Sequence, residues 1–248
     1  MRLKIRATAP VMLLLVVISA TASLQALSAG YVASGSIEST DSPPLVDVPV
    51  WSMATMNDDG ATTNMNLLTY ATPVSIRPTR LYALGLYKGT LSRDNFLRDK
   101  TCILQLLSAS DEKHVECVRL LGGSSGNDLS KEDELSSVHG IELQVLDGSD
   151  DDKNQPLPKV LPGCVRYLQL SMVGDEVTDY DGGESSHDVV ICKVDKMWTT
   201  KATPQGLESD GQLNSDGGTH DEEHLSTRQL RKLGLITEQG RIAPLPEE

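Results

Sequence analysis

The residues with the clearest capacity for chemistry lie in the segment YKGTLSRDNF, residues 87–96. We expect a strand to end at Lys88, and Thr90 and Ser92 follow at the start of an expected helix. Backbone N–H groups at a helix start, two hydroxyls and a lysine can form an anion site, especially for phosphate. The alternative is an ordinary capped helix beside a solvated lysine, and these residues alone leave both interpretations open.

A second candidate is His187, which follows the glycine-rich turn DGGESS, opens an apolar strand and stands next to Asp188. A histidine at the mouth of a strand, beside a carboxylate, can donate to an anionic group or orient a substrate. An ordinary histidine at the start of a strand is the alternative.

The third candidate is the stretch TTNMNLLTYATPVSIRP, residues 62–78. It interleaves Thr and Asn with Met, Leu and Tyr, where a buried strand would carry mainly Val, Ile and Leu. Either one face of this strand is wet, or a flat polar ligand lies along it.

Other chemistries find no support in the residues. The cluster GGSSG (122–126) follows an expected helix and precedes a polar loop, so it does not fit a dinucleotide-binding turn, and Walker A and G-x-S-x-G motifs are absent. His220 and His224 have zincin-like spacing, but Asp221 stands where that motif needs Glu, so we expect no metal site. The formal net charge of −13 argues against a nucleic-acid partner.

The N-terminus reads as a targeting segment. Arg2, Lys4 and Arg6 precede the short apolar run 11–20, which small residues follow. The run is too short to span about 30 Å of hydrocarbon comfortably, so we expect a cleaved presequence and no stable membrane span after its removal. A signal peptide leading to the secretory pathway and a transit peptide leading to a plastid both fit, and residues 1–40 are treated as presequence and disordered leader.

The remaining chain is expected to be mainly β. We expect strands at 48–56, 61–73, 81–88, 101–108, 162–173 and 187–198, an Asp-Gly hairpin turn at 57–60, and helices at 89–99, 111–122 and 225–236. This pattern favours a β-barrel or sandwich with peripheral helices over a doubly wound sheet. The expected organisation is a domain over 45–200, an acidic Gly/Ser-rich linker over 201–224, and a C-terminal helix and tail over 225–248.

The four cysteines match no zinc-site spacing. Buried free thiols are the favoured interpretation, and disulfides are the alternative for an exported protein. The residues concerned are Cys102, Cys117, Cys164 and Cys192.

Taken in order, several segments resemble the flavin reductase-like family of FMN-binding split β-barrels. They are VWSMATMNDDGATTNMNLLTYATPVSIRP, LYALGLYKGTLSRDNFLRDKTCILQLLS, ECVRLLGGSSGND, HDVVICKV and RQLRKLGLITEQGRIAPL. The resemblance covers about residues 47–200 and 225–245, and it rests on the order of the segments, since no single motif is diagnostic. One departure is DGGESSHD before the late strand, where family reductases commonly show Gly-Asp-His.

The resemblance implies a mainly β (β/α mixed) fold: a six-stranded split β-barrel with short peripheral helices, a disordered N-terminus and an acidic linker. It implies a homodimer that holds FMN, with FAD as the alternative, near the subunit interface and reduces flavin with NADH or NADPH. The other hypothesis is a non-catalytic flavin-binding or interaction module on the same scaffold. The implied site comprises the flavin-lining residues Thr63, Asn64, Asn66, Thr69, Tyr70 and Thr72, the phosphate-side residues Lys88, Thr90, Ser92 and Asn95, and the catalytic residue His187.

Overall fold

The computed structural model describes residues 45–147, 156–174, 177, 185–200 and 223–244. The strands are β1 Trp51–Met56, β2 Thr63–Leu68, β3 Ala71–Ser75, β4 Leu81–Tyr87, β5 Thr101–Leu106, β6 Arg166–Met172 and β7 His187–Thr199. The helices are α2 Leu91–Asp99, α3 Glu112–Glu116, α4 Val118–Gly123, α5 Lys131–Ser137 and α6 Thr227–Lys232. The expected presequence and most of the expected acidic linker lie outside the described residues.

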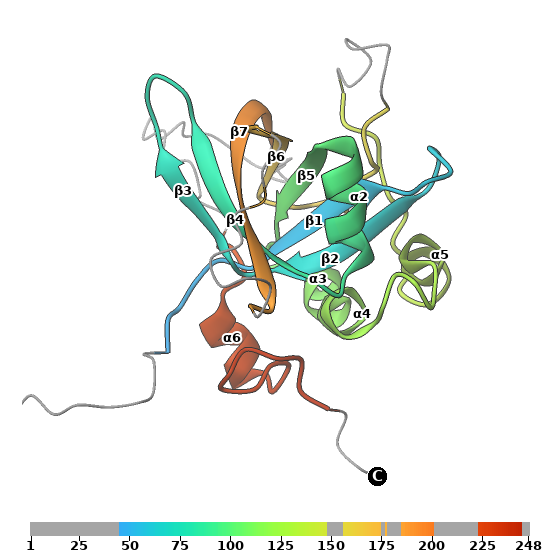
Figure 1. The fold of residues 1–248 in the computed structure, drawn as a ribbon. Helices are drawn as coiled ribbons and strands as arrows, with labels where there is room; N and C mark the ends of the chain where they lie inside the picture. Colours follow the sequence, from blue (N-terminus) through green and yellow to red (C-terminus); the bar gives the residue numbers. More distant parts are fainter. Residues whose placement is uncertain (1–44, 148–155, 175–176, 178–184, 201–222, 245–248) are drawn as a thin grey trace, which may run out of the picture. The chain divides into compact units, whose positions relative to one another are not determined.

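The strands form one seven-stranded antiparallel sheet in the order β2-β1-β5-β6-β7-β4-β3 (Figure 1). Its two edge strands, β2 and β3, are consecutive in the chain and are separated only by Thr69 and Tyr70. Because so short a link cannot span an open sheet of this width, the sheet must curl until its edges approach each other. The expected mainly β split barrel is therefore confirmed, but its sheet has seven strands and not the expected six, because the expected strand 61–73 forms both β2 and β3.

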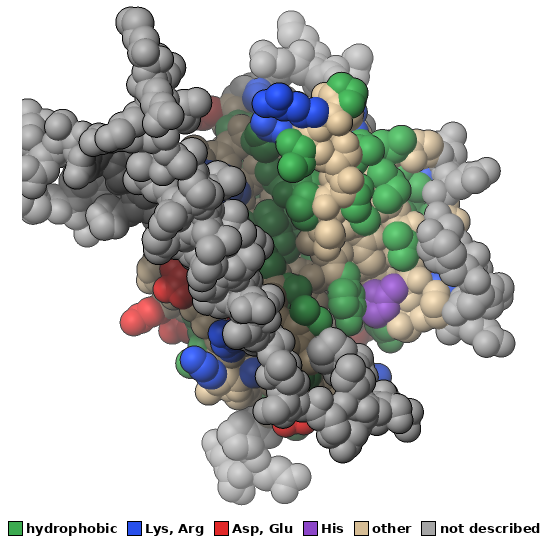
Figure 2. Space-filling model, turned by 90° about the vertical axis from the view of Figure 1, so that its left-hand side faces the viewer, with side chains coloured by type: hydrophobic (Ala, Val, Ile, Leu, Met, Phe, Trp, Pro, Cys, Tyr) green, Lys and Arg blue, Asp and Glu red, His purple; other side chains and the backbone are tan. Residues whose placement is uncertain are grey.

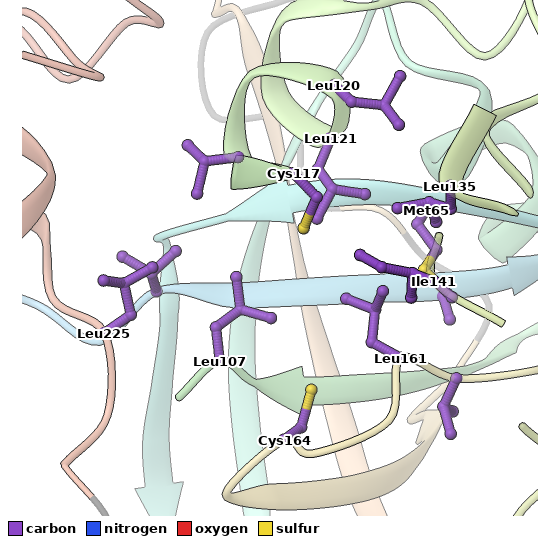
Figure 3. Packing of buried hydrophobic residues seen from close by; sticks show 14 of the residues in the cluster. Met65, Leu107, Cys117, Leu120, Leu121, Leu135, Ile141, Leu161, Cys164 and Leu225 are labelled. Carbon is purple, nitrogen blue, oxygen red and sulfur yellow. The ribbon is translucent and has the colours of Figure 1, made fainter. Parts of the chain in front are cut away.

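Two hydrophobic clusters lie on the two faces of the curled sheet. The interior cluster includes Trp51 and Met53 of β1 together with Phe96 of α2. The second cluster takes the alternate β1 residues, such as Ala54, and packs them against α3, α4, α5 and the C-terminal segment (Figure 3). Because β1 is buried on both faces, its sequence is mostly apolar and does not alternate.

Three elements differ from the expectation. The expected strand 61–73 is broken at residues 69–70, where the chain crosses from one sheet edge to the other. The expected helix 111–122 divides at Cys117, which ends α3 and begins α4. Helix α5 was not expected, because its sequence KEDELSS carries one apolar residue; its N-cap is Ser130, whose hydroxyl accepts from the backbone N–H of Asp133.

The C-terminal helix α6 packs within the second cluster through Leu230, and Leu225 and Ile236 on either side of it are also buried there. A capping box formed by Ser226 and Gln229 fixes the start of α6. The four cysteines are buried and form no disulfide bond, in agreement with the favoured interpretation. In the part of the chain that the structure describes, no helix is both long and apolar enough to cross a membrane.

Candidate functional site

Three aromatic side chains, Tyr70, Tyr87 and His187, meet where β3 begins and β4 pairs with β7; we call them the ring cluster. Tyr87 lies opposite His187 in the β4–β7 register, and the Tyr70 carbonyl accepts from the backbone N–H of Gly85 at 2.9 Å. The His187 ring centroid lies 5.3 Å from that of Tyr70, edge-on at 89°, and 5.5 Å from that of Tyr87. Because the tyrosines are 61% and 52% exposed, the cluster presents open aromatic surface.

The ring cluster lies on the outer face of the sheet. Leu84 and Leu86 of β4 point into the barrel interior, so Gly85 and Tyr87 point outward by strand alternation. A Cβ atom on Gly85 would lie 3.0 Å from the Tyr70 Cβ, so the absence of a side chain there leaves room for Tyr70.

Burial lowers the pKa of His187 below its usual range, and the neighbouring charge of Asp188 opposes this effect only in part. The imidazole is therefore neutral at neutral pH. Its Nδ1 atom lies 2.9 Å from the Ser186 hydroxyl oxygen. A neutral ring at this position offers a hydrogen-bond donor and an acceptor without adding a charge.

An apolar strip continues from the ring cluster along the same outer face. Ala83 of β4 pairs with Ile191 of β7, and the backbone N–H of Val173 donates to the Ile191 carbonyl at 2.8 Å. Val173 and Ile191 are exposed. Figure 2, viewed from the side where β3 lies in Figure 1, shows hydrophobic side chains gathered on this side of the molecule with a histidine at their margin.

A charged group made of Lys88, Arg93, Asp94 and Asp188 lies at the same end of β4 and β7, where Asp188 follows His187 and, by strand alternation, points to the inner face of the sheet. The Arg93 Nε and Nη2 atoms lie 2.7 Å and 2.6 Å from the Asp188 Oδ2 atom, and the Lys88 Nζ atom lies 3.8 Å from its Oδ1 atom. Arg93 also donates from Nη1 to the Asp94 carboxylate at 2.8 Å. Burial lowers the pKa of Arg93, but the two aspartates outweigh burial and raise it overall.

Helix α2 begins beside this group as expected. Thr90 is its N-cap: its hydroxyl accepts from the backbone N–H of Arg93 at 3.4 Å and donates to the Tyr87 carbonyl at 3.0 Å. Thr90 thus joins the start of the helix to the end of β4, next to the ring cluster.

Two of the implied site residues, Asn64 and Ser92, are instead bonded to each other inside the protein. The Asn64 side-chain amide donates to the Ser92 hydroxyl at 2.8 Å, and their residues are 4% and 0% exposed. A Cβ atom on Gly126 would lie 2.4 Å from the Asn64 Oδ1 atom, so the GGSSG loop packs directly over this amide. The pair therefore connects β2, α2 and that loop.

Asn95 and Thr63 are also buried in internal contacts. The Asn95 amide donates to the Asn57 side chain at 3.0 Å, which ties α2 to the β1–β2 turn. The Thr63 hydroxyl accepts from the backbone N–H of Lys159 at 2.9 Å.

The remaining implied residues are more accessible: Asn66 and Thr69 are half-buried, and Thr72 is exposed. The structure thus brings together four implied residues, Tyr70, Lys88, Thr90 and His187, in or next to the ring cluster and the charged group.

Sequence reasoning missed Arg93 and Tyr87 as members of the site. Arg93 carried only a weak signal, because a cation in the first turn of a helix opposes the helix dipole and is stabilised by nearby anions, of which Asp94 is one. Its other carboxylate partner, Asp188, lies 95 positions away in the chain. Among the residues that the structure describes, no group of His, Cys, Asp and Glu side chains could hold a metal ion.

Comparison with known proteins supports the fold. No protein-family model matches the chain, and no curated protein sequence matches it significantly. Among solved structures, flavoredoxin from Methanosarcina acetivorans is similar at 12% identity and a TM-score of 0.51, over 68% of this chain and 77% of that chain. Flavoredoxin of Desulfovibrio vulgaris (Miyazaki F) is similar at 14% identity and a TM-score of 0.51, over 67% of this chain and 78% of that chain. The fold is thus that of the flavin reductase-like FMN-binding split barrels.

Proposed function

We propose that this protein binds a flavin against the ring cluster and reduces it with NADH or NADPH. The observation that carries the proposal is the ring cluster itself: exposed aromatic surface around a neutral histidine, with two cations paired to the adjacent residue Asp188, on a barrel with the flavoredoxin fold. Flat ligands with polar edges need this combination of aromatic packing and a few polar groups.

The residues present fit a flavin in distinct roles. Tyr70 and Tyr87 offer ring surface for packing against isoalloxazine, and His187 offers a neutral donor or acceptor at its margin. We assign the side of the ribityl phosphate to Lys88 and Arg93, the two cations that pair with Asp188. The flavin, when bound, supplies the hydride chemistry, while the protein supplies binding and orientation.

We further propose that the protein is a homodimer that buries the outer apolar strip. An exposed apolar strip on a sheet face, continuous with a ligand site, is the kind of surface that a second copy covers. Ile191→Asp places a charge in the middle of that strip. We expect it to give a monomer in sedimentation equilibrium, whereas the control Val138→Asp, at another exposed valine, leaves the dimer intact.

Titration with FMN tests flavin binding, and rapid mixing of the complex with NADH or NADPH tests reduction. We expect flavin fluorescence to change on binding and the oxidised flavin band to bleach after mixing. If flavin binds but neither nucleotide bleaches it, the non-catalytic flavin-binding module is the correct reading. If neither FMN nor FAD binds, the flavin proposal is wrong.

A further inference from the structure

The charged group beside the ring cluster has no net formal charge. Lys88 and Arg93 contribute two positive charges, and Asp94 and Asp188 contribute two negative charges. A site that binds a phosphate dianion strongly normally leaves its cations in excess. Here the side-chain nitrogen of each cation already lies within 4.0 Å of a carboxylate oxygen.

Three of the five N–H groups of Arg93 are directed at these carboxylates. Its Nε and Nη2 atoms face Asp188, and its Nη1 atom faces Asp94. A phosphate that approaches Arg93 therefore meets a guanidinium whose charge is already matched by carboxylate contacts at 2.6–2.8 Å, with the second N–H of each Nη atom left to donate. The Asp188 side chain is only 4% exposed, so its charge is held next to Arg93 with little screening by solvent.

The two hydroxyl groups at the start of α2 are already engaged in internal contacts. The N-cap Thr90 hydroxyl already accepts from the Arg93 backbone N–H, and the Ser92 hydroxyl is buried against Asn64. By contrast, the ring cluster beside it keeps more than half of each tyrosine exposed. The site therefore has exposed surface for a flavin ring, whereas the cations that a phosphate would need are already neutralised by carboxylates.

From this arrangement we infer that Asp188 is a specificity-determining residue that makes the site select the isoalloxazine ring rather than the phosphate. The protein then takes flavin as an exchangeable substrate, and riboflavin and FMN are bound about equally well. This inference rests on the proposed flavin site and states which class of flavin that site prefers.

The test measures the phosphate preference, defined as the Kd of riboflavin divided by the Kd of FMN, from flavin fluorescence titrations. For the unaltered protein we expect a phosphate preference within about threefold of one, because the charged group is neutral. Asp188→Asn keeps the size of the side chain and an oxygen acceptor for Arg93 but removes the charge. We expect it to raise the phosphate preference roughly three- to tenfold, with riboflavin affinity unchanged.

Lys88→Ala changes the charge in the opposite sense, so we expect the phosphate preference to fall below one. Asp195→Asn is the matched control, because Asp195 also lies on β7 and pairs with Lys193, but it lies outside the charged group. It should leave the phosphate preference unchanged. A salt series on the unaltered protein needs no variant and should leave the phosphate preference flat, because a neutral group exerts little screened attraction.

Four results would overturn the inference. One is a phosphate preference above about thirtyfold in the unaltered protein, and another is a preference that falls steeply with salt. The third is an Asp188→Asn variant in which both affinities change by the same factor. The fourth is a failure to bind either flavin, which also overturns the proposed function; the first three leave the proposed function standing.

Discussion

The buried pair formed by Asn64 and Ser92 allows a sharp test of what these polar residues do. Ser92→Ala removes the acceptor of a 2.8 Å hydrogen bond between side chains that have almost no solvent exposure. The Asn64 amide then remains buried without that acceptor, which costs about 1–3 kcal/mol of unfolding free energy. Only one oxygen atom is lost, so the cavity contribution is small.

A double-mutant cycle isolates this bond. Asn64→Ala removes the amide and its packing under Gly126, so it should destabilise the protein by itself. In the Asn64→Ala protein, Ser92→Ala leaves no buried amide without an acceptor, so it should lower the unfolding free energy only slightly. The expected coupling free energy between the two residues is therefore about 1–2 kcal/mol. Urea unfolding followed by tryptophan fluorescence measures all four proteins.

The same variants separate structure from ligand binding. If Asn64 and Ser92 only brace β2 against α2, Ser92→Ala lowers the free energy of unfolding and changes flavin affinity less than about twofold. A Ser92→Ala protein as stable as the parent, or a coupling free energy of zero, would refute this reasoning. Loss of flavin binding at unchanged stability would instead place Ser92 at the ligand, as the sequence resemblance implies.

Two further predictions concern other parts of the molecule. Burial lowers the pKa of Lys131 to about 8, while its Nζ atom donates to the Leu121 carbonyl at 2.8 Å. The pKa of Lys131 is lower in the folded than in the unfolded protein, so its deprotonation should increase the unfolding free energy as the pH rises from about 8 to 10.5. In urea unfolding measured across this pH range, Lys131→Met should abolish the increase that Lys131 contributes. Gly85→Ala forces a Cβ against Tyr70 and should weaken flavin binding several-fold in a fluorescence titration, with an unfolding free energy within about 1 kcal/mol of the parent. Unchanged flavin affinity in that variant would show that the position of Tyr70 does not matter for binding.

Local chemistry made part of the fold predictable. The Asp-Gly turn at 57–60, with Gly60 at a φ of 63°, and the Thr90 cap of α2 follow from short-range preferences that a sequence displays directly. The break at residues 69–70 was not predictable in this way, because it arises where the curled sheet passes from one edge to the other. Helix α5 was likewise not predictable, because its sequence is almost entirely polar. Its N-cap and the burial of Leu135 stabilise it.

The site was predictable in part for the same reason. The family resemblance implied Ser92 and Asn95 as ligand groups, but their spacing relative to Phe96 places all three on one face of α2. That face is buried, which helical periodicity could have shown. The pairing of Arg93 with Asp188 depends on contacts between segments far apart in the chain, and short-range patterns carry no information about it.

The segment around Leu225 has a consequence for the order in which the protein folds. The Val50 N–H donates to the Leu225 carbonyl, the Leu225 N–H to the Leu107 carbonyl, and the Leu107 N–H to the Val50 carbonyl. These three residues, distant in sequence, therefore close a ring of backbone hydrogen bonds. During synthesis residue 225 must leave the ribosome before this ring can close, so the direct bond between Val50 and Leu107 can form earlier than the two bonds that involve Leu225.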